Sequence, residues 1–201
     1  MNKAEYSSAI KKTQFAYLPS VKVAKQMRKG LIYEQVFAAV YDKNTINIQS
    51  EARRREVINV VYSRLKNLDD YLLNAFLDGS IATSKFILVY AIAKTDKLFT
   101  EFLFSLYREA LVGDKKYISI SDFEDFFDAA KERNKSIAKW SVYTISDLAG
   151  GYRNILVESG LGHRVRKNVY ADKALIDPAV VNHIKEVGDG EYIRALLGEE
   201  K

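Results

Sequence analysis

Apolar residues recur at intervals of three and four along most of the chain, which is the spacing of one face of an α-helix. In residues 50–66, SEARRREVINVVYSRLK, this stripe consists of Val57, Ile58, Val61 and Leu65. Comparable stripes predict further helices over residues 19–29, 33–42, 69–77, 81–95, 96–112, 121–133, 141–159 and 178–187. Two prolines and ten glycines leave little room for the turns of an all-β protein. The pattern therefore predicts a mainly α fold, a compact multi-helix bundle.

Several residues next to these stripes are typical helix ends. Ser50, Asp69, Ser80 and Ser141 are expected to cap helices, because their side chains can accept from free backbone N–H groups. Residues 121–124, SDFE, match the capping box and predict a helix start there. The acidic residues in and after that box lack the spacing of a calcium loop. Gly150-Gly151 interrupts the stripe of its helix, which indicates either a close contact or a kink.

Residues 1–18 have no sustained period and are expected to form an arm, with a short extended piece packed on the body. The next three helices, ending at Lys66, resemble a helix-turn-helix unit with a long second connection. The third of them begins with Arg53, Arg54 and Arg55. Positive charge opposes the macrodipole at a helix start, so the run indicates either a phosphate-binding surface or an incidental, solvated charge cluster.

Residues 161–176 differ in character from the helices. His163, Arg164, Arg166 and Lys167 alternate with apolar residues, which predicts a short basic β-hairpin with its turn near residues 167–168. A long helix followed by a basic hairpin is the order of a winged helix, whose wing touches DNA. A hairpin that merely covers the bundle is the alternative.

Charge divides the chain unevenly around a net +5. Residues 1–70 hold thirteen Lys and Arg against seven Asp and Glu, whereas residues 71–140 hold ten of each. We expect two regions that pack as one unit: residues 1–68 with the arm and the helix-turn-helix-like helices, and residues 69–201 with the bundle, the hairpin and the terminal helices. Basic surfaces on a neutral body favour a nucleic-acid ligand.

Composition disfavours most catalytic chemistry. The chain has no cysteine and only two histidines, His163 and His183, and it lacks a phosphate-binding glycine loop and a serine elbow. No secretory signal is evident, and the apolar run 86–93 is far too short to span a bilayer. We expect a cytoplasmic, non-enzymatic protein without a cofactor, a metal, a membrane partner or a small-molecule substrate.

Short motifs along the chain carry a family resemblance. They are Arg64-Leu65, Leu68-Asp69, the Ser-Asp-Phe of residues 121–123, Trp140-Ser141 and the Leu-x-Glu-x-Gly-Leu of residues 156–161. In this order they resemble the BrxA family, small accessory proteins of BREX phage-exclusion systems. The resemblance implies a helical, non-enzymatic component of a bacterial antiviral system, with nucleic acid as ligand and other BREX proteins as partners. It supplies no catalytic residue.

Charge and position, rather than the resemblance, select the candidate site. Arg53, Arg54, Arg55 and Lys66 are expected to form one contact surface, and Arg164, Arg166 and Lys167 another. Double-stranded DNA is the favoured ligand, and structured RNA is an alternative. A second alternative is a helical adaptor that docks other BREX proteins through the aromatic faces around residues 99–107.

Overall fold

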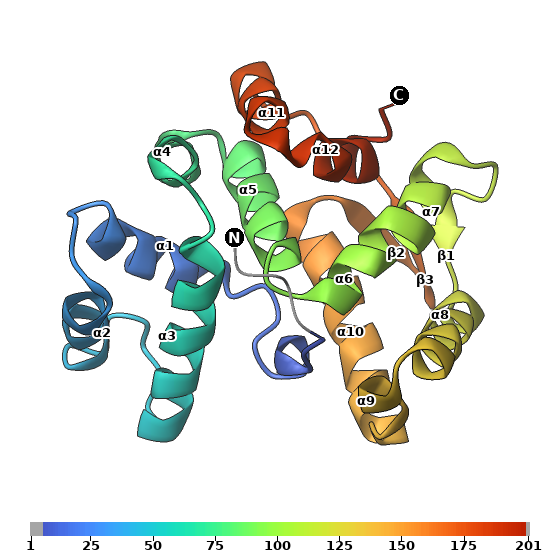
Figure 1. Cartoon of the computed structure of the whole chain (residues 1–201), viewed down its shortest axis with the longest axis horizontal. Helices are drawn as coiled ribbons and strands as arrows, with labels where there is room; N and C mark the ends of the chain where they lie inside the picture. The colour runs from blue at the N-terminus through green and yellow to red at the C-terminus, as the bar shows by residue number, and fades with distance from the viewer. Residues whose placement is uncertain (1–5, 200–201) are drawn as a thin grey trace.

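The computed structural model describes residues 6–199 and consists mainly of helices, with one small sheet (Figure 1). The elements of the first half are a 3-10 turn at Ala9–Lys11, α1 (Tyr17–Met27), α2 (Tyr33–Tyr41), α3 (Glu51–Leu65), α4 (Asp70–Asp78) and α5 (Ile81–Ala93). The second half contains α6 (Lys97–Phe102), η2 (Leu103–Tyr107), α7 (Arg108–Val112), β1 (Tyr117–Ile118), α8 (Ile120–Arg133), α9 (Lys135–Ala138), α10 (Val142–Ser159), β2 (Gly162–Val165), β3 (Asn168–Ala171), α11 (Pro178–Ile184), η3 (Lys185–Asp189) and α12 (Gly190–Leu197).

The predicted caps at Ser50, Asp69, Ser80 and Ser141 are confirmed, because each side chain accepts from a backbone N–H of the first turn. The capping box predicted at residues 121–124 was placed two residues too late. Ser119 is the N-cap, and its hydroxyl accepts from the Asp122 N–H at 3.3 Å. The Asp122 carboxylate accepts in return from the Ser119 N–H at 2.7 Å.

The predicted hairpin is present and belongs to a three-stranded antiparallel sheet with strand order β1-β3-β2. Its turn consists of Arg166 and Lys167, one residue earlier than expected, and Arg166 has a left-handed φ of 56°. Strand β1 was not predicted, because two residues, Tyr117 and Ile118, are too few to show an alternation.

Helix α5 lies in the middle of the bundle. Its run Phe86–Ala93 is buried throughout. The buried side chains form one cluster that extends from Ile10 to Leu196 and joins the N-terminal helices to the rest. Among the helices of residues 6–199, none has the length and apolar character needed to cross a bilayer.

The helix predicted over residues 96–112 is continuous but not uniform. It begins at the Asp96 cap, makes a π-helical turn at η2 and returns to α-helix in α7. The predicted C-terminal helix stops being α-helical at Ile184 and passes into a second π-helical turn, η3. Gly188 there has a φ of 88°, which separates α11 from α12.

Candidate nucleic-acid interface

Residues 7–16 form an N-terminal strap that lies between α3 and α10 (Figure 1). On the α3 side, the buried Arg64 guanidinium donates to the carbonyl oxygens of Thr13 at 2.5 Å and Gln14 at 2.7 Å. On the α10 side, Gly151 faces Ile10 so closely that a Cβ at residue 151 would lie 2.8 Å from Ile10 Cγ2. The expected arm is thus a packed strap, and its short regular piece is a 3-10 turn rather than an extended strand.

Arg53 holds the strap from the N-terminal end of α3. Its guanidinium donates to Thr13 Oγ1 at 2.9 Å and to the Lys12 carbonyl oxygen at 2.5 Å. The same group also pairs with Glu56 at 2.9 Å. A side chain with this many internal partners loses most of its freedom to rearrange around a ligand. Arg53 therefore holds its positive charge mainly at a fixed position.

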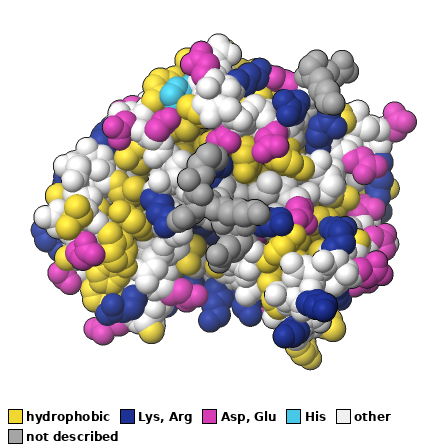
Figure 2. Space-filling model, viewed as in Figure 1, with side chains coloured by type: hydrophobic (Ala, Val, Ile, Leu, Met, Phe, Trp, Pro, Cys, Tyr) yellow, Lys and Arg dark blue, Asp and Glu magenta, His cyan; other side chains and the backbone are white. Residues whose placement is uncertain are grey.

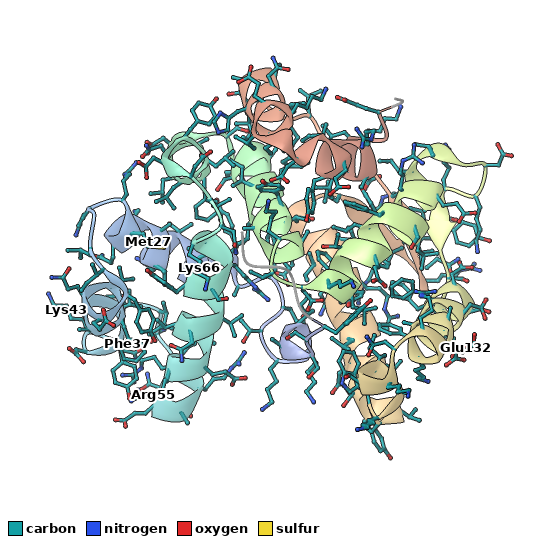
Figure 3. The ribbon with its side chains drawn as sticks, in the orientation of Figure 1. Met27, Phe37, Lys43, Arg55, Lys66 and Glu132 are labelled. Carbon is teal, nitrogen blue, oxygen red and sulfur yellow. The ribbon has the colours of Figure 1, made fainter. Side chains whose placement is uncertain are left out.

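Arg54 and Arg55 both face α2, but they are engaged differently. Arg54 donates to the carbonyl oxygens of Tyr41 at 3.0 Å and Ile48 at 2.9 Å, and so satisfies acceptors at the end of α2 and in the following loop. Arg55 is exposed, and its guanidinium lies over the rings of Phe37 and Tyr41 at 5.3 and 5.2 Å (Figure 3). This stacking leaves the N–H donors of Arg55 free to face outward.

Lys66 does not share a surface with the three arginines. It is the C-cap of α3, whereas Arg53, Arg54 and Arg55 occupy the first turns of the same helix. At 1.5 Å per residue, eleven residues separate Arg55 from Lys66 by roughly 16 Å. Figure 3 shows these two residues at opposite ends of α3. The expected single surface of four cations is therefore divided into two.

The second predicted cluster adjoins the strap. Arg164 on β2 donates to Oδ1 of Asn154 on α10, and Asn154 Nδ2 donates to Gln14 Oε1 at 2.6 Å. Arg53 and Arg164, far apart in sequence, thus border the same strap from its two sides. Arg166 and Lys167 form the exposed tip of the hairpin.

Helix α10 presents its N-terminal half to solvent between these cations. Val142 and Tyr143 are 79% and 84% exposed. Lys11 of the strap lies 3.5 Å from Thr144 Oγ1, and Lys135 and Lys139 precede the helix. Sequence reasoning missed these lysines because they are scattered singly; only their proximity to α10 marks them.

Burial shifts the pKa values of several ionisable side chains in this region. Arg153 on α10 is half-buried, and burial together with the neighbouring Arg164 charge lowers the pKa of its guanidinium. Beneath the strap, burial raises the pKa of Asp96 to about 7 and lowers that of Arg64 to about 10. Asp96 Oδ2 and the Tyr152 hydroxyl are both buried without a hydrogen-bond partner in the described part of the chain. The surface of this region, in contrast, carries positively charged side chains, hydroxyl groups and the exposed ring of Tyr143.

The two histidines are each paired with a carboxylate. His163 Nδ1 lies 2.8 Å from Asp172 Oδ2, and His183 Nε2 lies 2.7 Å from Asp69 Oδ2. Within residues 6–199 no three His, Asp or Glu side chains are grouped so that they could hold a metal ion. The arrangement suits binding of an anionic polymer better than acid–base or metal chemistry.

Comparisons with known proteins agree with one another. A family model described as BrxA matches residues 4–188. A BREX protein BrxA from Bacillus cereus strain H3081.97 is 34% identical over 194 residues, which cover 96% of this chain and 97% of that protein. The crystal structure of an uncharacterized protein from Magnetospirillum magneticum has the same fold, with a TM-score of 0.82 at 19% identity over 96% of this chain and 99% of that one.

Proposed function

Because the chain belongs to the BrxA family and is thus a component of a BREX anti-phage defence system, we propose that it is a non-enzymatic accessory protein that binds double-stranded DNA. The proposal rests on the order of the helices and strands from α7 to β3. Helix α7, β1, α8, the four-residue α9, α10 and the β2–β3 hairpin follow one another, and β3 is the middle strand of the sheet. This is the order of a winged helix in which α10 is the recognition helix.

The exposed half of α10 suits the major groove. Recognition helices present their N-terminal residues to base edges. In α10 these residues include Val142, Tyr143 and Ser146, all exposed. An apolar side chain can contact a thymine methyl group, and the two hydroxyls can accept or donate toward base edges or phosphates. Few of these contacts distinguish all four base pairs, so we expect a limited sequence preference.

Phosphate contacts supply most of the affinity in this proposal. On the hairpin the contacting residues are Arg164, Arg166 and Lys167, and on the strap they are Lys11 and Lys12. Figure 2 shows Lys and Arg side chains, with some Asp and Glu among them, along the lower edge of the molecule. Charge–phosphate contacts release condensed counterions, so binding weakens steeply as salt rises.

The arginines of α3 have divided roles in the proposal. Arg53 and Arg54 position the strap and the end of α2, and Arg53 adds positive potential at the edge of the interface. Arg55 has free donors and is the better candidate for direct contact. Lys66 lies beyond reach of this surface and would touch DNA only if the duplex also followed α3. If the charges of all three arginines were reversed, DNA binding could be lost because the strap and α2 no longer pack or because DNA contacts are lost. The experiment would not separate these two causes.

A cleaner test uses the hairpin tip. We expect Arg166→Glu with Lys167→Glu to weaken binding of a fluorescent 20-base-pair duplex at least 10-fold at 100 mM salt, measured by anisotropy. The matched control is Lys22→Glu with Lys25→Glu, which makes the same charge change at exposed positions on α1, on the opposite side of Figure 1 from the hairpin. The control is expected to lose no more than about 3-fold.

Two results would contradict the proposal. Equal losses of DNA affinity in both double variants would show that only the net charge of the protein matters. Unchanged DNA affinity of the hairpin variant would show that the hairpin does not contact DNA. Competition with duplex RNA of the same sequence decides the nucleic-acid class. A-form RNA has a deep, narrow major groove that α10 cannot enter, so DNA should compete more strongly.

A further inference from the structure

A second surface, with chemistry opposite to that of the interface, lies between the α6–η2–α7 helix and α8. It is a groove of about 710 Å³. Its apolar floor consists of Phe104, Leu106 and Phe126, all only partly buried. We call it the α7–α8 groove. A volume of this size is enough to bury anchor side chains of a ligand.

The groove carries an excess of negative charge in a protein whose net charge is +5. Four carboxylates line it against two cations, Lys97 and Arg133. Both cations are engaged, since Lys97 lies over the Tyr6 ring at 4.6 Å and Arg133 pairs with Glu101 at 3.5 Å. Asp122 is also engaged, by Lys115 and Ser119.

The two remaining carboxylates, Glu109 and Asp125, are exposed and have no ion-pair or hydrogen-bond partner among residues 6–199. They stand on opposite walls, one on α7 and the other on α8. A polyanion is repelled from such a groove, whereas a ligand with Lys or Arg beside apolar anchors matches both its floor and its walls.

The backbone hydrogen bonding of the groove walls favours a helical ligand over an extended peptide. Both walls are helices whose N–H and C=O groups are used internally, so an extended peptide would find no main-chain partners. A helix that lays its side chains between two others needs none. The π-helical turn η2 opens the wall at this point, with Phe104 and Leu106 in the groove while Leu103 and Tyr107 stay buried. Such turns are frequent at functional sites.

From these observations we propose that the α7–α8 groove docks a basic amphipathic helix of another protein of the BREX system. The inference does not depend on DNA binding. In Figure 1, α6 and α7 overlie α10 and the hairpin, and none of the residues that line the groove belongs to the proposed DNA surface. The chain then acts as a bridge with a basic face for DNA and an acidic, apolar groove for a protein.

The direct test uses the full-length ¹⁵N-labelled chain and two synthetic 18-residue helical peptides. Both peptides carry the same Leu and Phe positions, and their solvent-facing residues are Lys in one and Glu in the other. We expect the Lys peptide to bind with a Kd below about 100 μM and to shift amide resonances of residues 97–109 and 120–133. The Glu peptide should bind at least 10-fold more weakly.

Charge reversal then locates the site. Glu109→Lys with Asp125→Lys should weaken the Lys peptide at least 10-fold. The matched control, Glu34→Lys with Asp42→Lys, makes the same charge change on α2 and should change the affinity less than 3-fold. Ser105→Trp, at an exposed groove position, should block the peptide by filling the groove without removing a core side chain.

The last arm uses the other proteins encoded by the same BREX system, co-expressed with the tagged chain. One identified subunit should co-purify at 500 mM salt with the wild type and with the α2 control. The groove variants should no longer retain this subunit. Their affinity for duplex DNA should be unchanged. Equal binding of the two peptides, shifts that map elsewhere, or no Lys-peptide binding at 1 mM would each overturn the proposal. A subunit retained by the groove variants would overturn it as well.

Discussion

Gln14 and Asn154 are joined side chain to side chain across 140 residues of sequence, with Asn154 Nδ2 donating to Gln14 Oε1 at 2.6 Å. The same Asn154 accepts from Arg164 through its other amide atom. One side chain of α10 therefore fixes both the strap and a cation of the hairpin. This contact connects the packing between the two halves of the chain with the geometry of the proposed DNA surface.

Asn154→Ala should destabilise the protein and also weaken DNA binding. The lost hydrogen bonds are expected to lower the free energy of unfolding by about 1 to 2 kcal/mol, measured by urea denaturation. A double-mutant cycle with Gln14→Ala should give a coupling energy of about 0.5 to 1 kcal/mol. Strictly additive losses would show that the two side chains do not interact in solution.

The two adjacent glycines of α10 should respond differently to alanine. A Cβ at Gly150 meets nothing within 4 Å, so Gly150→Ala should gain up to about 1 kcal/mol of helix propensity. A Cβ at Gly151 would lie 2.8 Å from Ile10 Cγ2 and 3.2 Å from the Ile10 carbonyl oxygen. Gly151→Ala should therefore be less stable than Gly150→Ala by roughly 1 to 3 kcal/mol. Equal melting temperatures for the two variants would contradict the close contact.

Asp96 should make stability depend on pH in an unusual direction. Burial raises its folded pKa to about 7, above the ordinary value of 3.8. Between these values the folded state binds more protons than the unfolded state, so this contribution is present in full below pH 3.8 and is lost as pH rises through 7. The change is on the order of 4 kcal/mol.

The measurement compares wild type with Asp96→Asn, because asparagine can still cap α6. Urea denaturation at pH 5 and pH 8 should show wild type losing stability relative to the variant as pH increases. A difference between the two proteins that does not vary with pH would place the pKa of Asp96 near its ordinary value. Other carboxylates titrate equally in both proteins and cancel in this comparison.

The hairpin cations should determine part of the salt dependence of DNA binding. Each phosphate contact adds about 0.9 to the slope of log K against log salt. Arg166→Gln with Lys167→Gln should therefore reduce the slope by roughly 2, measured by anisotropy between 50 and 200 mM salt. An unchanged slope would mean that neither side chain neutralises a phosphate.

Local signals in the sequence were sufficient for most of the helices and for the hairpin, but not for the four-residue helix α9. Helix caps such as Ser50 and Asp69 act within three residues of themselves, so their positions can be inferred without the fold. The two-residue strand β1 could not be predicted, because Tyr117 and Ile118 become a strand only by pairing with Tyr170 and Val169. The capping box was misplaced because two overlapping local patterns compete: Ser119 and Asp122 have the same spacing as Ser121 and Glu124.

The candidate site was harder to predict, because charge alone does not show how a side chain is used. Arg53, Arg54 and Arg55 are equivalent in sequence, yet the first two bind backbone carbonyl groups that lie far from them along the chain or in the preceding loop. Arg64 belongs to a short sequence motif that reveals no role for it, yet it is 2% exposed and anchors the strap. Such roles depend on long-range partners that no local pattern reveals.

The strap also bears on how the chain is made. Its residues are synthesised about 140 residues before Gly151 and Asn154, against which they pack. At 5 to 20 residues per second this interval lasts roughly 7 to 30 seconds. Throughout that time Ile10 and Phe15, both buried in the finished protein, lack part of their surroundings and are open to chaperones. The strap can therefore complete its packing only after α10 has been made.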